Sequence, residues 1–183
     1  MARGWYNFSL NNLNQYQGNY LEIGIFGAIG LVSLAGKYRD KTIYGIDPFI
    51  EDGYTSATSG IASGNQLSDI RNLALSRAAP YSNIKIFEQS SVDFNKNLTV
   101  ELIQELDVSC VFIDGNHHYE FVKNDAELAM KLIANKSGGI CFDDVTIPGV
   151  EQAFNEFQNI YKDRITEIID VDLSTKLLQI KQG

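Results

Sequence analysis

The sequence lacks several features that mark specialised protein classes. It has only two cysteines, fewer basic than acidic residues (15 against 23), and no long hydrophobic run. Cys110 and Cys141 each lie in a short apolar run, which indicates buried thiols in a reducing compartment rather than a disulfide framework. We therefore expect a cytoplasmic protein.

The charge and the hydrophobic pattern argue against a nucleic-acid partner and against a membrane-spanning segment. A net charge of −8 repels a phosphate backbone, so we expect no nucleic-acid partner. The longest uncharged apolar stretch, Ile23 to Gly36, is interrupted by Gly and Ser and is shorter than the roughly 20 residues that a spanning helix needs. The first residues also lack the apolar region of a signal peptide. We expect no membrane span.

What is present fits one α/β domain over residues 1–183. A content of 44% hydrophobic and 21% charged residues is ordinary for a folded domain. Short apolar runs alternate with segments of helical period, which is typical of βαβ units and a mostly parallel sheet. Strands are expected at Tyr20–Ile25, Thr42–Ile46, Ile84–Phe87, Ser109–Ile113 and Gly139–Phe142. Helices are expected at about 66–79, at 119–134, and over the apolar stripe Val150, Phe154, Phe157 and Tyr161, with Thr146 before Pro148 as a start signal.

The last part of the sequence predicts an antiparallel hairpin. Two strand-like runs, 165–171 and 176–181, are separated by residues 172–175, a loop too short for a parallel crossover. Five strands with intervening helices, closed by an antiparallel pair, resemble the class I S-adenosylmethionine (SAM) methyltransferase fold. The resemblance implies a Rossmann-like, seven-stranded, mostly parallel sheet in the order 3-2-1-4-5-7-6, with an antiparallel last strand and helices on both faces.

The first two strands end in candidate cofactor-binding residues. Glu22 and Gly24 lie at the tip of the first strand, and Asp47 ends the second strand 25 residues after Glu22. An acid at that place can accept both ribose hydroxyls of an adenosine, and a glycine permits close approach of a cofactor to the backbone. The dinucleotide motif Gly-x-Gly-x-x-Gly is absent because residue 26 is Phe, which disfavours NAD and a nicotinamide oxidoreductase. A tight turn without any ligand is the alternative interpretation.

Ser90 and Ser91 follow the third strand, where a class I methyltransferase usually contacts adenine. We expect them to bind the cofactor. A helix N-cap before Val92 explains these serines equally well.

The fourth and fifth strands end in acidic residues. Asp114 follows the fourth strand, and Asp143 and Asp144 follow the fifth, 29 residues later, which is about one βαβ unit. Three carboxylates at one edge of a sheet raise one another's pKa, and a bound divalent cation relieves this repulsion. Oxygen ligands favour Mg²⁺, Ca²⁺ or Mn²⁺ over zinc. Alternatively, Asp143 and Asp144 only cap the crevice and bond backbone amides.

One longer pattern is specific. The segment 113–120, Ile-Asp-Gly-Asn-His-His-Tyr-Glu, is followed by Asp125, Gly138-Gly139, Phe142-Asp143-Asp144 and Pro148-Gly149-Val150. This pattern closely resembles the small methyltransferases related to macrocin O-methyltransferase, class I methyltransferase family 24, over roughly residues 18–160.

The resemblance implies a role for each matching residue. Asp114, Asp143 and Asp144 correspond to the metal ligands of these enzymes, and Asp114 also lies at the cofactor site. His117 falls where the relatives carry a Lys or His general base. The sequence departs from several relatives at Asn116, where they have Asp, and at Ala28 and Gly30, where they have Gly and Ser.

The leading hypothesis is transfer of the SAM methyl group to a hydroxyl of a small-molecule acceptor. A metal would lower the pKa of that hydroxyl and His117 would take its proton, with Asp114 taking part in catalysis. The alternative is a non-catalytic SAM- or nucleotide-binding subunit that acts through a partner.

Two short segments are expected to contact the acceptor: an amino-terminal substrate or lid segment, residues 1–19, and Asp52 to Ser56. The amino-terminal aromatic residues Trp5, Tyr6, Phe8 and Tyr16 can equally serve packing or contact between subunits of a homo-oligomer.

Overall fold

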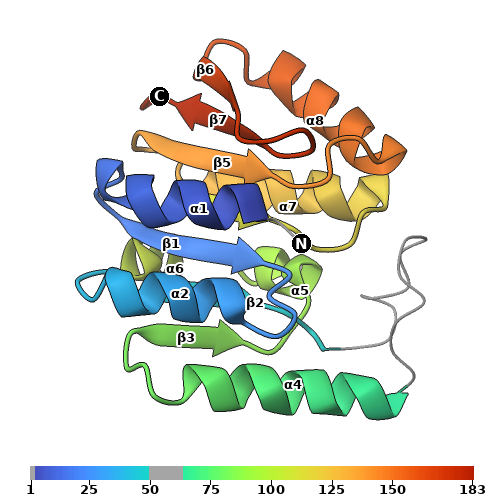
Figure 1. The fold of residues 1–183 in the computed structure, drawn as a ribbon. Coiled ribbons are helices and arrows are strands. Elements are labelled where there is room, and N and C mark those ends of the chain that lie inside the picture. The colour runs from blue at the N-terminus through green and yellow to red at the C-terminus, as the bar shows by residue number, and fades with distance from the viewer. Residues whose placement is uncertain (1–2, 50–63) are drawn as a thin grey trace.

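The computed structural model describes residues 3–49 and 64–183 (Figure 1). In it, seven strands form one sheet in the order β3-β2-β1-β4-β5-β7-β6, which confirms the order that the resemblance implies. The strands are β1 (Asn19–Ile23), β2 (Ile43–Ile46), β3 (Ile84–Phe87), β4 (Val108–Ile113), β5 (Gly138–Phe142), β6 (Ile165–Asp170) and β7 (Lys176–Ile180). The first five are parallel, and β7 pairs antiparallel with both β5 and β6. The expected Asp52 to Ser56 contact lies outside the described residues.

Helices cover both faces of the sheet. They are α1 (Arg3–Asn12), α2 (Ile29–Lys37), α4 (Gly64–Ala78), α5 (Ser91–Lys96), α6 (Val100–Leu106), α7 (Tyr119–Leu132) and α8 (Pro148–Ile160), with a 3₁₀ turn, η1 (Leu13–Gln15). The face with α1, α2 and α4 shares one hydrophobic cluster, and α5 to α8 pack into a second cluster on the opposite face. In Figure 1, α1 and α2 cross in front of the strands.

The central strand β4 shows why the sheet is buried on both faces. All six of its residues are buried, and none is charged, as expected for a parallel strand between two helical layers. Successive side chains alternate: Cys110 and Phe112 join the α1 side, and Val111 and Ile113 join the α7 side. Cys110 and Cys141 are free thiols inside the α1-side cluster.

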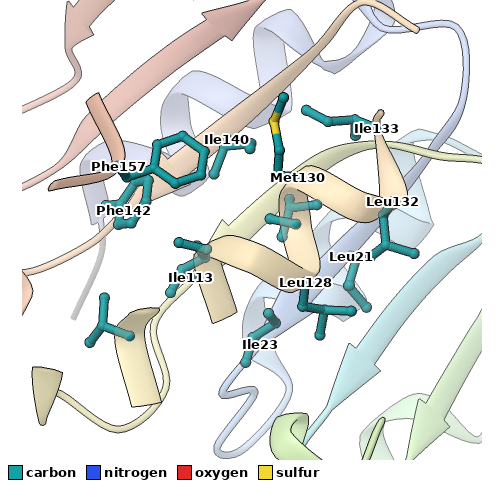
Figure 2. Packing of buried hydrophobic residues seen from close by; sticks show 14 of the residues in the cluster. Leu21, Ile23, Ile113, Leu128, Met130, Leu132, Ile133, Ile140, Phe142 and Phe157 are labelled. Atoms are coloured by element: carbon teal, nitrogen blue, oxygen red, sulfur yellow. The ribbon is translucent and has the colours of Figure 1, made fainter. Parts of the chain in front are cut away.

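The α7-side cluster is the larger of the two hydrophobic clusters. Figure 2 shows its strand side chains Leu21, Ile23, Ile113, Ile140 and Phe142 against Leu128, Met130, Leu132 and Ile133, with Phe157 of α8 beside Phe142. The apolar stripe of α8 that the sequence predicts is confirmed, because Val150, Phe154 and Phe157 are buried. The start signal differs: Ile147 is the N-cap without a side-chain cap bond, and Pro148 opens the helix.

Helix α1 belongs to the hydrophobic interior of the protein. Trp5 is fully buried and stacks on Phe112, with ring centroids 5.2 Å apart. Its indole N–H donates to the Tyr20 hydroxyl at 3.0 Å. Tyr16 is also buried, and its hydroxyl donates to Gln179. For Trp5 and Tyr16 the packing interpretation therefore holds.

Among the described segments, no helix combines the length and the apolar character needed to cross a bilayer.

Candidate functional site

The sheet register aligns the predicted site residues in one row. Ile23 of β1 is level with Ile46 of β2 and Ile113 of β4, and Ile113 is level with Phe142 of β5. The residues that follow continue the ladder, since Gly24 donates to Ile46 and Asp114 donates to Ile23, each at 2.9 Å. Gly24, Asp47, Asp114 and Asp143 therefore come one residue beyond their strands, at the same carboxyl edge. This is the edge where open α/β sheets bind ligands.

Three side chains at this edge form a group that can hold a metal ion. One ligand atom each from Asp114, His117 and Asp144 lies within 4.8 Å of the others. His117 Nε2 is 3.8 Å from Asp114 Oδ1 and 3.6 Å from Asp144 Oδ2. These distances exceed those of hydrogen bonds, and both ring nitrogens of His117 are buried without a hydrogen-bond partner among residues 3–49 and 64–183. The His117 imidazole thus lies between two carboxylates.

The electrostatics of this group follow from burial and mutual repulsion. Interaction with the Asp114 carboxylate raises the pKa of His117, and the charge of Asp144 adds to that effect. Burial raises the pKa of Asp114. For Asp143, burial and then the charge of Asp114 raise the pKa to about 6. The ionised carboxylates are therefore destabilised by burial and by their mutual repulsion, and a bound cation would relieve this destabilisation.

The Asp143 side chain has different contacts from those of Asp114 and Asp144. It is buried, and its Oδ1 accepts a hydrogen bond from the Thr175 hydroxyl at 2.5 Å. Thr175 precedes β7, so the carboxyl-terminal hairpin fixes this carboxylate. The structure brings His117, rather than Asp143, into the three-residue group of Asp114 and Asp144. No sequence signal pointed to Thr175.

Glu22 lies beneath two tyrosines. It is 1% exposed, and its two oxygens accept hydrogen bonds from the hydroxyls of Tyr6 (3.1 Å) and Tyr20 (3.2 Å). Burial, and next the charge of Asp114, raise the pKa of Glu22 to about 8. Tyr6 also packs on Gly30 of α2, where an added Cβ would lie 2.1 Å from the ring. The departure at Gly30 therefore makes room for α1 at the site.

Asp47 is engaged by backbone amides. Its Oδ2 accepts from the N–H groups of Ile25 (3.1 Å) and Phe26 (3.0 Å), and its Oδ1 accepts from Phe49 (2.8 Å). The carboxylate thereby ties the loop after β1 to the end of β2. This role was not predicted from the sequence.

The loops at this edge are conformationally strained. Phe26, Ala28, Phe49 and Asp144 all have positive φ, and they follow β1, β2 and β5. Such strain costs roughly 1–3 kcal/mol per residue and tends to cluster at functional sites.

Ser90 and Ser91 lie at the start of α5. Ser90 is the N-cap of α5 and accepts from the Asp93 N–H at 3.0 Å, as the capping alternative predicted. Ser91 begins α5, and its hydroxyl lies close to the buried Asp125 of α7 and lowers the pKa of that carboxyl. Asn116 accepts from the His118 N–H at 2.9 Å and shapes the turn before α7, a bond that an Asp would make equally well.

A seven-stranded sheet in this order, with acidic side chains at the ends of β1, β4 and β5, defines a class I methyltransferase-like fold. A family model described as a methyltransferase domain, Methyltransf_24, matches residues 21–145. The chain belongs to this family of methyltransferases. No curated protein matches the sequence.

Solved structures share the fold at low sequence identity. The O-methyltransferase NovP is 16% identical with a TM-score of 0.57, covering 97% of this chain and 78% of NovP. TomG, an O-methyltransferase from Streptomyces achromogenes involved in tomaymycin synthesis, is 17% identical with a TM-score of 0.61, covering 97% and 78%. CalS11, a TDP-rhamnose 3'-O-methyltransferase, is 13% identical with a TM-score of 0.63, covering 94% and 77%. These matches establish the common fold.

Proposed function

We propose that the protein is a SAM-dependent O-methyltransferase that methylates a hydroxyl of a small molecule. The observation that carries the proposal is the group of Asp114, His117 and Asp144 at the carboxyl edge of the sheet. Membership of a methyltransferase family supports SAM as the methyl donor, and the O-methyltransferases among the structural neighbours support an oxygen acceptor.

The donor set fits a hard divalent cation such as Mg²⁺. Two carboxylates supply oxygen ligands, and the unbonded imidazole nitrogens of His117 face the same space. When bound there, such a cation would supply Lewis-acid chemistry that lowers the pKa of an acceptor hydroxyl. We assign Asp114, Asp143 and Asp144 to hold it, with Asp143 fixed in place by the hydrogen bond from Thr175.

His117 is assigned as the general base. Its Nε2 is the nitrogen nearest to both carboxylates, and it would take the acceptor proton. The two carboxylates stabilise the imidazolium that results. Because methyl transfer is an in-line displacement, most of the remaining catalysis would come from holding the acceptor oxygen, the methyl carbon and the sulfur collinear.

The methyl donor is expected over the ends of β1 and β2. Glu22, Gly24, Asp47, Ser90, Ser91 and Asp114 are the proposed cofactor-binding residues. Helix α2 begins without a side-chain cap, which leaves its amino end suited to a carboxylate such as that of the methionine moiety. The segment 1–19 is proposed to border the acceptor through Tyr6, whose hydroxyl bonds Glu22 at the site.

Two measurements test this proposal. Isothermal titration with S-adenosylhomocysteine tests cofactor binding, and transfer of labelled methyl from SAM to a panel of catechols and sugar diols, with Mg²⁺ or with EDTA, tests activity. We expect binding, and Mg²⁺-dependent transfer that Asp144→Asn abolishes and Glu127→Gln, an exposed change on α7, leaves intact. Binding without transfer to any acceptor would support the non-catalytic subunit instead, and no binding would refute both.

A further inference from the structure

Helix α7 carries a buried carboxylate to which neither the sequence pattern nor the proposed reaction assigns a role. Asp125 is 1% exposed and lies on the buried face of the helix. The Asn124 amide donates a hydrogen bond to Oδ1 at 3.0 Å, and the neutral Ser91 hydroxyl lies close enough to the same carboxylate to lower its pKa. Burial raises the pKa of Asp125 to about 7. An apolar residue would avoid this desolvation cost.

One side of Asp125 reaches the turn after β3. Ser91 is the first residue of α5, directly after the N-cap Ser90. The Asn124 amide also approaches the Ser91 hydroxyl at 3.4 Å and accepts a hydrogen bond from Asn95 at 2.9 Å. The start of α5 is thereby bonded to the middle of α7.

The other side of Asp125 faces the loop that carries the metal-capable group. A Cβ added to Gly115 would lie 3.1 Å from Asp125 Oδ2, so the backbone passes directly against the carboxylate. From the opposite side, a Cβ added to Gly24 would lie 2.1 Å from the Asp114 carbonyl oxygen. The loop after β4 is therefore held between the end of β1 and Asp125, immediately before His117.

We propose that Asp125 is a positioning residue that fixes the Ser91 turn and the Asp114–His117 loop relative to each other. This inference rests on the proposed function, in which the first segment meets the adenine of the methyl donor and the second holds the cation and the base. Asp125 touches neither ligand and acts through Ser91 and through the backbone at Gly115.

The test uses a double-mutant cycle on the full chain. Asp125→Asn keeps the volume of the side chain but removes one acceptor oxygen, and Ser91→Ala removes the hydroxyl. We expect Asp125→Asn to weaken binding of S-adenosylhomocysteine about tenfold and Ser91→Ala about three- to tenfold, as is typical when a buried polar interaction is lost. The loss in the double variant should be clearly smaller than the sum of the two single losses, because both changes break one linkage. Glu127→Gln, which removes an exposed charge two residues away, is the matched control and should bind like the wild type.

A second readout reports on the other end of the linkage. Ser91→Ala should weaken Mn²⁺ binding, measured by the electron paramagnetic resonance of free Mn²⁺, although Ser91 is not in the metal-capable group. Ser91→Ala keeps the proposal testable if Asp125→Asn fails to fold. Additive losses in the cycle, or wild-type affinities in a folded Asp125→Asn variant, would overturn the proposal. Failure of the wild type to bind S-adenosylhomocysteine would instead refute the proposed function.

Discussion

Glu22 links the stability of the protein to pH. Burial and the charge of Asp114 raise its pKa from an ordinary value near 4.5 to about 8. The folded protein therefore binds a proton that the unfolded chain releases. The stabilisation is fully present below pH 4.5 and is lost as the pH rises through 8.

We predict that the free energy of unfolding falls from pH 5 to pH 8, and that Glu22→Gln makes this fall smaller. Glutamine can still accept a hydrogen bond from Tyr6 or Tyr20 but does not ionise. Urea unfolding at the two pH values measures the difference. Glu127→Gln should keep the wild-type pH dependence, and an unchanged dependence in Glu22→Gln would show that this carboxyl does not titrate as described.

Protonation of His117 should cause the loss of kcat/KM at low pH. Its interaction with Asp114 raises its pKa above the ordinary value of 6.5, and a base works only when deprotonated, so kcat/KM should fall as the pH drops through that raised value. We predict that His117→Gln lowers kcat about a hundredfold or more, removes this limb and leaves the affinity for S-adenosylhomocysteine unchanged. The neighbouring, exposed His118 provides the control variant His118→Gln. A His117→Gln enzyme with full kcat would rule out the base role.

At this scale, the sequence predicts positions better than orientations. Asp114, His117 and Asp144 meet because strand ends in a parallel sheet share an edge, which the spacing of the strands reveals. The orientation of Asp143 depends on Thr175, 32 residues away along the chain, and no local pattern encodes that contact.

The turn after β1 depends on the absence of a side chain at Gly24. Gly24 has φ +85°, and an added Cβ would lie 2.1 Å from the carbonyl oxygen of Asp114, a backbone atom that cannot move aside. We predict that Gly24→Ala lowers the free energy of unfolding by about 3 kcal/mol, from backbone strain together with the steric clash. Urea unfolding measures this loss.

Gly36 gives the matched control for this prediction. It lies inside α2, where an added Cβ would meet the Tyr81 ring at an ordinary 3.7 Å. Gly36→Ala should therefore stabilise the protein by about 0.5–1 kcal/mol, the usual gain of alanine over glycine in a helix. If the two variants lost equal stability, the special role of Gly24 would be contradicted.

The elements with strong periodicity could be predicted from the sequence. The strands β1 to β5, and helices α4, α7 and α8, lie within a few residues of their expected bounds. The short helices α5 and α6 carry too few turns to show an apolar period. Helix α1 is recognised only through its packing, since Trp5 is buried by Phe112 from a strand far along the chain.

A bound cation should raise the free energy of unfolding of the whole molecule. If Mg²⁺ binds the folded state alone, a concentration 100 times its Kd stabilises by about 2.7 kcal/mol and raises the melting temperature. We predict this rise for the wild type and its absence in Asp144→Asn, measured by thermal unfolding. An equal ionic strength of NaCl corrects for screening of the net charge of −8. An equal rise in Asp144→Asn would place the cation elsewhere.

The strand topology could be predicted from the short loop before the last strand together with the family resemblance. The four-residue loop between the last two strand-like runs requires an antiparallel hairpin, and this is observed. Pairing of β7 with β5, however, is a contact between distant segments that hydrophobic patterns alone do not specify. The family resemblance predicted this pairing.

The position of β7 also bears on how the protein is made. This strand leaves the ribosome after β5 and β6, yet it lies between them in the sheet. Until it emerges, the edge of β5 has no antiparallel partner, and Asp143 lacks the hydroxyl of Thr175. An open strand edge on a nascent chain is prone to wrong pairing, so the chain is exposed to aggregation during this stretch of translation. The carboxyl edge of the sheet at β5 would then be among the last parts of the molecule to fold.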